Sequence, residues 1–254
     1  MQHNINSLLG YKMAATDGMI GEVDDFYFDD GDWVIRYIIL KTGNWLSGRK
    51  VLISPAALIK IFWKTGLFPV NVSKQQIRDS PDIDLEKPVS RQREVELCQY
   101  YNWESNWGIG FFGGGALYFV DSYLVTDEDV NKETAKMTKR PGEDIHLRSI
   151  KELTGYNIHT TDGEIGHLSD FIIDDKDWEL KFIVAGTDNW FGRKKVLIDI
   201  KHLEKIDWEN TQVFLDVTRA SIEKCKLFDE QQFSTLETDD NITINAPLIS
   251  NKIR

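Results

Sequence analysis

One stretch of the chain occurs twice, and this duplication limits the possible folds more than any other feature. TDGMIGEVDDFYFDDGDW, residues 16–33, returns as TDGEIGHLSDFIIDDKDW, residues 161–178. A shift of 145 residues aligns Gly10–Ser80 with Gly155–Cys225 without a gap. Two copies indicate a duplicated domain, because a solenoid needs more units to bury its core. The copies share turn-forming and aromatic residues, among them Gly10/Gly155, Tyr11/Tyr156, Asp25/Asp170, Phe26/Phe171, Trp33/Trp178, Trp45/Trp190 and Trp63/Trp208.

Each copy has the pattern of several short β-strands. Apolar residues recur with a period close to two over 19–28, and Val, Ile and Tyr are dense over 33–40 and 50–53. Such patterns are typical of half-buried strands. Gly18 and the Asp-rich stretch 29–32 favour tight turns between them.

Two more strands are predicted near Leu58–Trp63 and Leu67–Val72. Ser73 is the predicted N-cap of a short helix, and Thr218 is its counterpart in the second copy. About six strands in roughly 65 residues predict a small antiparallel barrel, because closure removes exposed sheet edges.

Three groups of residues in each copy resemble the PRC-barrel domain family. They are GYKMAATDGMIGEVDDFYFDD, KTGNWLSGRKVLISPAAL and SKQQIRDSPDID, repeated as GYNIHTTDGEIGHLSDFIIDD, GTDNWFGRKKVLIDIKHL and TRASIEKCKLFD. The resemblance covers about 150 of the 254 residues and continues into SPDIDLEKPVSRQREVE, which is similar to the segment after the first barrel in bacterial proteins with two such domains.

This resemblance implies a fold more specifically than a function. PRC-type barrels occur in the cytoplasmic part of the photosynthetic reaction centre H subunit and in a ribosome maturation factor that contacts a small-subunit ribosomal protein. What the resemblance implies is a docking or scaffold module, with no catalytic residue set to carry over.

The expected fold class is therefore mainly β, with two small antiparallel PRC-type β-barrels of about six strands each and short helices. A barrel of roughly 75 residues buries little surface alone, so we expect the two to pack as a pseudo-twofold pair. The expected domains are a first barrel at 1–84, an irregular or helical linker at 85–148, a second barrel at 149–230 and a tail at 231–254.

The linker combines a predicted helix, Pro88 to Trp103, with an uncharged run, Trp107 to Val120. That run has 14 residues, fewer than the roughly 20 that a membrane-spanning helix needs. Three interpretations stay open: a lid between the barrels, a surface for a protein partner or for self-association, and a peripheral membrane contact. In the second interpretation, Trp107, Phe111 and Phe112 would contact the partner.

Two other stretches are polar. Residues 121–148 lack a clear period and are expected to connect the copies as a loop. Beyond about Asp229 the chain is again polar until Ile242–Ile249, and an extension of this tail across the other domain is one interpretation.

The acidic balance disfavours binding to duplex nucleic acid. The net charge of −11 divides into −1 over residues 1–85, −4 over 86–145 and −6 over 146–254, so none of these parts is net basic. Nucleic-acid binders usually carry a clustered basic face.

No pattern of catalytic or cofactor-binding residues stands out, so we expect neither an enzyme nor a bound cofactor. Asp29, Asp30 and Asp32 and their counterparts could attract a cation, but they lack the spacing of a calcium loop and are interpreted as turn residues. Cys98 and Cys225 have neither CxxC spacing nor the density of a secreted scaffold. With no signal peptide in the sequence, a cytoplasmic location is predicted.

The best candidates for an interaction surface lie after the third strand of each copy. Trp and Arg are the residue types that most often anchor interfaces, although the Trp residues could instead plug the barrels. The candidates are Trp45, Arg49, Lys50, Trp190, Arg193 and Lys194.

The sequence thus favours a non-enzymatic module that binds protein partners, with a homodimer among its possible forms. The alternatives are a ribosome-assembly or RNA-linked adaptor, a membrane-associated accessory of an electron-transfer complex, and a metal-dependent sensor.

Overall fold

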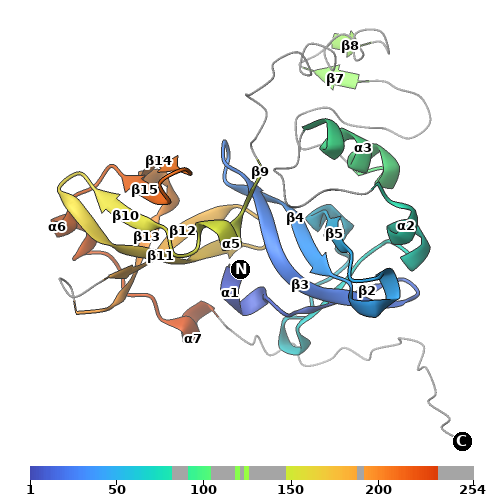
Figure 1. Cartoon of the computed structure of the whole chain (residues 1–254), viewed down its shortest axis with the longest axis horizontal. Helices are drawn as coiled ribbons and strands as arrows, with labels where there is room; N and C mark the ends of the chain where they lie inside the picture. The colour runs from blue at the N-terminus through green and yellow to red at the C-terminus, as the bar shows by residue number, and fades with distance from the viewer. Residues whose placement is uncertain (82–90, 104–117, 121–122, 126–146, 188–191, 234–254) are drawn as a thin grey trace, which may run out of the picture.

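The protein has two large β-sheets, one formed mainly by each copy of the duplicated sequence, and a small hairpin between the copies in sequence (Figure 1). The computed structural model describes residues 1–81, 91–103, 118–120, 123–125, 147–187 and 192–233. The sheet of the first copy has six strands and that of the second copy has seven. The predicted class, mainly β with a few short helices, is confirmed.

The first sheet has the strand order β5-β4-β3-β2-β6, with β9 paired to β3 outside this path. Its pairs are antiparallel except β2 and β6, which run parallel, so the sheet is mixed where the sequence predicts antiparallel pairing throughout. Within the described ranges no ladder joins its end strands. The elements of this half are β1 (Gln2–Asn4), α1 (Ile5–Leu8), β2 (Lys12–Ala15), β3 (Gly18–Asp29), β4 (Val34–Lys41), η1 (Gly43–Leu46), β5 (Lys50–Ile53), η2 (Pro55–Ala57), η3 (Trp63–Thr65), β6 (Leu67–Pro69) and α2 (Lys74–Asp79).

The second sheet repeats this plan in the order β13-β12-β11-β10-β15-β14, with β1 paired to β11 outside the path. Here too one pair, β10 with β15, is parallel. Its elements are β9 (Leu147–Ser149), α5 (Ile150–Leu153), β10 (Asn157–Thr160), β11 (Gly163–Asp174), β12 (Leu180–Thr187), β13 (Lys195–Asp199), η5 (Ile200–His202), β14 (Leu203–Asp207), β15 (Gln212–Leu215), α6 (Arg219–Ile222) and α7 (Glu230–Phe233).

The glycines of the repeated motif have a steric role. Gly21 in β3 has a φ of +156°, and a Cβ there would collide with the backbone carbonyl of Lys41 in β4. The close approach of the two strands therefore requires glycine. The predicted helix after Ser73 is also present, as α2, and Ser73 and Gln76 form a reciprocal capping box.

One predicted strand differs between the copies. Residues 203–207 form β14 in the second copy, whereas the equivalent stretch 58–62 makes only the isolated bridges of Leu58 with Val70 and of Phe62 with Leu67. In the second copy Phe214 pairs with Lys205, and the first copy has Pro69 at the position of Phe214. Because proline has no N–H to donate, this ladder cannot form in full.

The linker helix is confirmed as α3 (Arg91–Tyr101), which packs on the first copy. Leu97, Cys98 and Trp103 are buried, and Cys98 Sγ lies 3.7 Å from the Tyr37 hydroxyl of β4. The hairpin of β7 (Tyr118–Val120) and β8 (Tyr123–Val125) follows. The rest of the apolar run, residues 107–117, falls outside the described ranges, so its predicted roles stay predictions.

The two copies exchange their first strands. β1 at the start of the first copy pairs with β11 of the second, and β9 at the start of the second copy pairs with β3 of the first. The helices that follow, α1 and α5, pack against the same partner strands. Because residues 2–4 and 147–149 are related by the same shift of 145, this reciprocal exchange is a pseudo-twofold arrangement.

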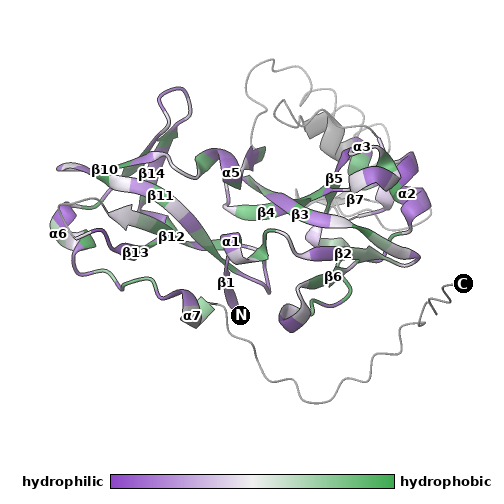
Figure 2. Cartoon of the chain, turned by 60° about the horizontal axis from the view of Figure 1, so that its bottom comes forward, coloured by the Kyte–Doolittle hydropathy of each residue, from purple (hydrophilic) through white to green (hydrophobic). Residues whose placement is uncertain are grey.

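A single hydrophobic core joins the two halves. Ile5 and Leu8 of α1 are fully buried, as are Leu153 of α5, Phe28 of β3 and Phe171 of β11, and all belong to one cluster. Figure 2 shows α1 and α5 between the two sheets, with α7 beside β1. The halves therefore share the buried surface that a single barrel of this size would lack.

Candidate functional site

The turns β3–β4 and β11–β12 meet at the centre of the molecule. Trp33 and Trp178 occupy equivalent positions there with left-handed backbones, at φ of 62° and 59°. Ile35 N donates to Trp178 O, and Leu180 N donates to Trp33 O, each at 2.8 Å. This pair of hydrogen bonds fixes the two copies against each other at their pseudo-twofold axis.

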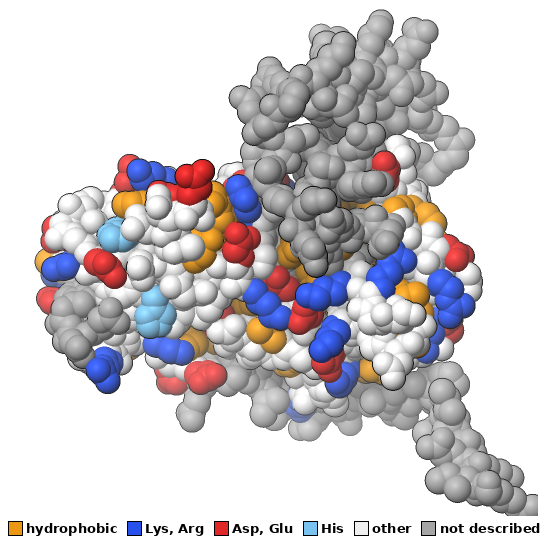
Figure 3. Space-filling model, viewed as in Figure 1, with side chains coloured by type: hydrophobic (Ala, Val, Ile, Leu, Met, Phe, Trp, Pro, Cys, Tyr) orange, Lys and Arg blue, Asp and Glu red, His pale blue; other side chains and the backbone are white. Residues whose placement is uncertain are grey.

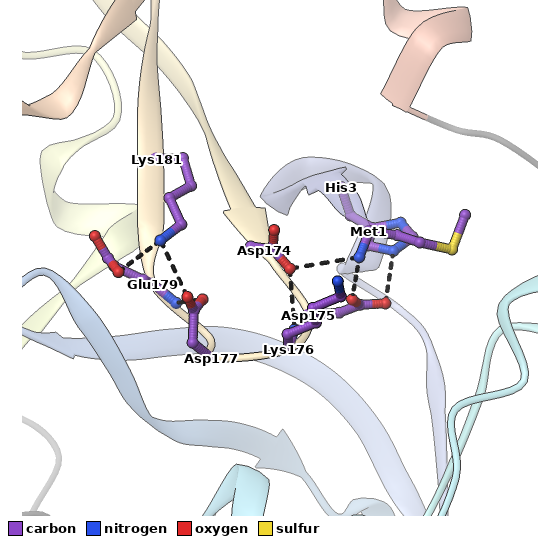
Figure 4. Close-up of polar contacts among 8 residues, drawn as sticks. All are labelled: Met1, His3, Asp174, Asp175, Lys176, Asp177, Glu179 and Lys181. Carbon is purple, nitrogen blue, oxygen red and sulfur yellow. Dashed lines mark hydrogen bonds and ion pairs between the residues drawn. The ribbon is translucent and has the colours of Figure 1, made fainter.

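Beside this contact, β1 brings polar groups of the first copy onto the β11–β12 turn (Figure 4). His3 Nε2 lies 3.2 Å from Asp175 Oδ2, and the Met1 amino group pairs with Asp175 and lies 3.4 Å from Asp174 Oδ1. The His3 ring stacks on Trp63 of the first copy, with centroids 3.6 Å apart. Burial lowers the pKa of His3, although Asp175 opposes this shift.

The pseudo-equivalent place has different chemistry. Arg148 of β9 replaces His3, with its guanidinium 4.1 Å from the centroid of the Trp208 ring and its Nε 3.4 Å from Asp30 Oδ2. An Arg is charged at any physiological pH, whereas a buried His is mostly neutral. The two sides of the molecule are therefore alike in fold and unlike in charge.

An open cavity of about 320 Å³, which we call the junction groove, lies beside Trp63 and Trp178. It is formed by both copies, and its lining residues are Pro55, Leu58, Ile59, Lys60, Ile61, Trp63, Asp175 and Trp178. Ile59 is 65% exposed, which is unusual for a large apolar side chain beside two tryptophans. The equivalent residue in the second copy is Glu204.

The wall of the groove is the stretch 58–62, where Pro69 prevents a full ladder. Sequence reasoning missed this site because it treated both copies as the same structure. The sequence difference was visible: in the gapless alignment of the two copies, Pro69 aligns with Phe214 and Ile59 aligns with Glu204.

The first copy also carries a basic run, residues 33–78, that the sequence analysis did not identify. Residues 33–78 contain eight Lys or Arg and no Asp or Glu. The equivalent residues 178–223 contain seven Lys or Arg and eight Asp or Glu. The net charge of −1 over residues 1–85 averages this basic run with the acidic residues before it. Figure 3 shows Lys and Arg side chains distributed over the first copy. Among the described residues, neither Lys60 nor Lys64 forms an ion pair.

The predicted interaction residues of the first copy lie away from the groove and contact their own domain. The Trp45 indole donates to Ile20 O at 2.7 Å, with Lys74 Nζ 5.6 Å from the ring centroid. Arg49 donates to the carbonyls of Ser80 and Pro81, and Lys50 pairs with Asp24 at 2.8 Å. Contacts of this kind, within the residue's own domain, are expected if Trp45 fills the end of the barrel. An interface role for Trp45, Arg49 and Lys50 stays a prediction.

Trp45→Phe separates these two interpretations. The change keeps an aromatic ring but removes the donor to Ile20 O, so we expect a loss of about 1 kcal/mol in the free energy of unfolding. Urea unfolding measures it. An unchanged stability together with weaker partner binding would instead identify Trp45 as an interface residue.

The other predicted residues belong to the second copy and to the linker. Arg193 and Lys194 are exposed just before β13, and Lys194 N donates to Thr187 Oγ1 at 2.9 Å. Trp190 lies in the stretch 188–191, and Trp107, Phe111 and Phe112 lie in 104–117, all outside the described ranges.

The acidic turns have structural partners. Asp29 accepts from Gly31 N at 2.9 Å and Asp32 accepts from Val34 N at 3.1 Å, while Arg36 pairs with Asp32. Over the parts of the chain that the structure describes, no group of three or more His, Cys, Asp or Glu is placed to hold a metal ion. Within the same parts, no helix combines the length and hydrophobicity required to span a bilayer.

Comparison with known proteins supports the fold. The family model described as PRC-barrel domain matches residues 2–64 and 146–222. Among curated proteins nothing matches the chain. The two matched regions together cover more than half of the 254 residues and begin at the exchanged strands β1 and β9. The chain therefore belongs to the PRC-barrel domain family and carries this domain twice, in tandem.

Proposed function

We propose that the protein is a non-enzymatic scaffold whose two PRC-barrel domains together form one protein-binding surface, centred on the junction groove. The observation that carries the proposal is Ile59, an exposed apolar side chain in a groove that both copies line. Apolar and aromatic side chains in a shared concavity are typical of the centre of an interface. Lys60 at the same place favours a partner with acidic residues near its apolar contact.

The duplication supports this proposal. The groove is lined by Pro55, Leu58–Ile61 and Trp63 of the first copy and by Asp175 and Trp178 of the second, so it depends on the packing of the two copies that the strand exchange supports. The two pseudo-equivalent places differ in hydrophobicity and charge, because Glu204 and Arg148 of the second copy stand at the positions of Ile59 and His3. Such asymmetry gives a scaffold a defined orientation on its partner.

Ile59→Glu tests the proposal. Full burial of an Ile side chain contributes about 1.5–3 kcal/mol, so we expect partner capture to fall at least about tenfold. The measurement is crosslinking and quantitative capture from nuclease-treated lysate of the source cells, which removes complexes bridged by RNA. Because Ile59 is exposed, the thermal midpoint should stay within about 2 °C.

Glu204→Lys is the matched control, since it changes an exposed residue at the equivalent position of the second copy. It should leave capture unchanged. Equal capture by wild type and Ile59→Glu would overturn the proposal, and loss of all capture after nuclease treatment would favour an RNA-linked adaptor instead.

A further inference from the structure

The wall of the junction groove is also an open edge of the first sheet. The stretch 58–62 lies beside β6, the last strand on that side of the sheet. Ile59 N donates to Pro69 O at 3.0 Å, and Phe62 N donates to Leu67 O at 2.9 Å. Within the described ranges no further strand pairs with the outer side of this stretch.

The middle of this edge has backbone groups without a partner. Among the described residues, neither Lys60 N nor Ile61 N donates a hydrogen bond, and no donor reaches the carbonyls of residues 59–61. In the second copy Lys205, the equivalent of Lys60, pairs with Phe214 of β15. Exposed strand edges of this kind are ready to pair with a strand from another chain.

The side chains beside the edge determine which kind of strand fits. Ile59 is exposed and Ile61 is half-buried, and both line the groove with Trp63 and with Trp178 of the other copy. In an added strand, alternate side chains lie on the same face of the sheet. A strand with apolar residues at every second position would therefore place them in this groove.

The charges beside the edge favour carboxylates in the occupant. Lys60 and Lys64 are exposed and form no ion pair within the part of the chain that the structure describes. Asp175, the acidic residue of the lining, is already paired within the protein. The equivalent edge of the second copy, β14, carries Glu204 and Asp207 and lacks this preference.

A second copy of this chain fits the edge less well than an acidic strand does. Antiparallel pairing of two identical edges, centred on residues 59–61, would bring the two Lys60 side chains close to each other. Like charges on directly paired strands are destabilising. The charge at the edge therefore favours a partner with a different sequence.

We propose that the occupant of the junction groove is an extended segment of a partner protein, with Asp or Glu between alternating apolar residues. This segment adds to residues 59–61 as a further β-strand, with its apolar side chains against Ile59, Trp63 and Trp178 and its carboxylates toward Lys60 and Lys64. The inference deepens the proposed function and rests on it, since it specifies what the groove binds.

A random peptide library displayed on phage, selected on the immobilised full-length chain, tests the chemistry of the occupant. Enriched peptides should alternate apolar residues with Asp or Glu and bind saturably in fluorescence anisotropy. Ile59→Glu and Lys60→Glu should each weaken this binding at least about tenfold. Lys205→Glu, at the equivalent exposed position of the second copy, is the matched control and should leave it unchanged. No enrichment, or enriched peptides without this alternation, would overturn the proposal.

The pairing of backbones has a readout of its own. When an enriched peptide binds, hydrogen exchange measured by NMR should slow severalfold at the amide of Lys60 or Ile61 and stay unchanged at that of Lys205. Two forms of the peptide, each N-methylated at one set of alternate amides, complete the test. One form should bind at least about tenfold more weakly, because a strand pairs through alternate residues. Unchanged exchange, or unweakened binding of both forms, would mean docking by side chains alone and would overturn strand addition.

Capture from lysate distinguishes a failure of this inference from a failure of the proposed function. If Ile59→Glu lowers capture from nuclease-treated lysate but no peptide pairs with the edge, the proposed function stands and strand addition fails. If peptides pair with the edge through Ile59 and Lys60 but capture does not depend on Ile59, the groove accepts strands and the proposed function fails.

Discussion

Cutting the chain between its two copies will leave them bound to each other as one particle. The reason is the exchange of β1 and β9, which places a strand and a helix of each half in the sheet and core of the other. A half that separated would expose the edge of β3 or β11 and the fully buried Ile5, Leu8 and Leu153. Exposure of this kind is too unfavourable to occur at micromolar concentration.

A protease site introduced within residues 126–146 allows the test on the intact protein. After cleavage, gel filtration should show both fragments in a single species, and native mass spectrometry should give it the mass of the uncut chain plus one water. Leu8→Ala in the same cut chain is the comparison, because removal of a buried Leu side chain costs about 2–5 kcal/mol and should promote separation. Fragments that separate without any substitution would contradict the exchanged arrangement.

The exchange could not be predicted from periodicity, for a physical reason. Gln2–Asn4 and Leu147–Ser149 are strands of three residues, too short to show a period of two, and their partners are distant in sequence. The available signal was the identity of Ile5 with Ile150 and of Leu8 with Leu153 at the same shift of 145. That identity extends the duplication upstream of Gly10 but does not say which sheet receives the strand.

Features with a local cause were predictable. Gly18 at the first turn, the N-cap at Ser73 and the dense apolar strand of 33–40 each depend on neighbouring residues, and all are present. The stretch 58–62 was predicted as a strand because its composition favours one. Its state depends instead on the absence of an N–H at Pro69 across the turn, and four residues of this stretch, Leu58–Ile61, line the groove.

Replacing Asp170 or Asp25 by alanine will lower the free energy of unfolding by about 3 kcal/mol or more. Asp170 accepts hydrogen bonds from Phe171 N at 2.8 Å and from Asn4 Nδ2 and Asn6 N at 3.1 Å. Asp25 accepts from Phe26 N, Ser149 Oγ and Lys151 N at 2.7, 2.6 and 3.2 Å. Each carboxylate thus links its own strand to the exchanged segment of the other copy.

The magnitude follows from the donors that alanine would leave without an acceptor. Each unsatisfied buried donor costs about 1–3 kcal/mol. Alanine removes the acceptor of two buried donors and one partly buried donor at Asp170, and of one buried donor and two partly buried donors at Asp25. Asp24→Ala is the matched control, since Asp24 is the neighbouring residue and pairs with Lys50 and Lys151 at the surface. Such exposed pairs contribute about 1 kcal/mol or less. Equal losses for Asp24→Ala and Asp25→Ala, measured by urea unfolding, would contradict the structural role.

The same carboxyls should also show an unusual dependence on pH. Burial raises the pKa of Asp25 and of Asp170 above the ordinary 3.8, although their hydrogen bonds oppose the shift. A folded state with the higher pKa binds more protons than the unfolded state, so the stability that these groups contribute falls as pH rises from 3.8 through the folded pKa. For Asp24 burial acts in the same upward direction, but Lys151 and Lys50 outweigh it and lower the pKa. Its contribution is therefore lost as pH falls.

A comparison of wild type with the double variant Asp25→Asn, Asp170→Asn isolates this effect, because the amides do not titrate and all other groups are common to both proteins. The wild type should exceed the variant in free energy of unfolding by the largest margin near pH 3.5, and the margin should shrink as pH rises towards about 7. Urea unfolding at several pH values measures the margin. A margin that grows with pH would mean that the hydrogen bonds from the exchanged segments stabilise the ionised carboxylates more than burial disfavours them, and the exchanged strands would then be held more tightly at neutral pH than in acid.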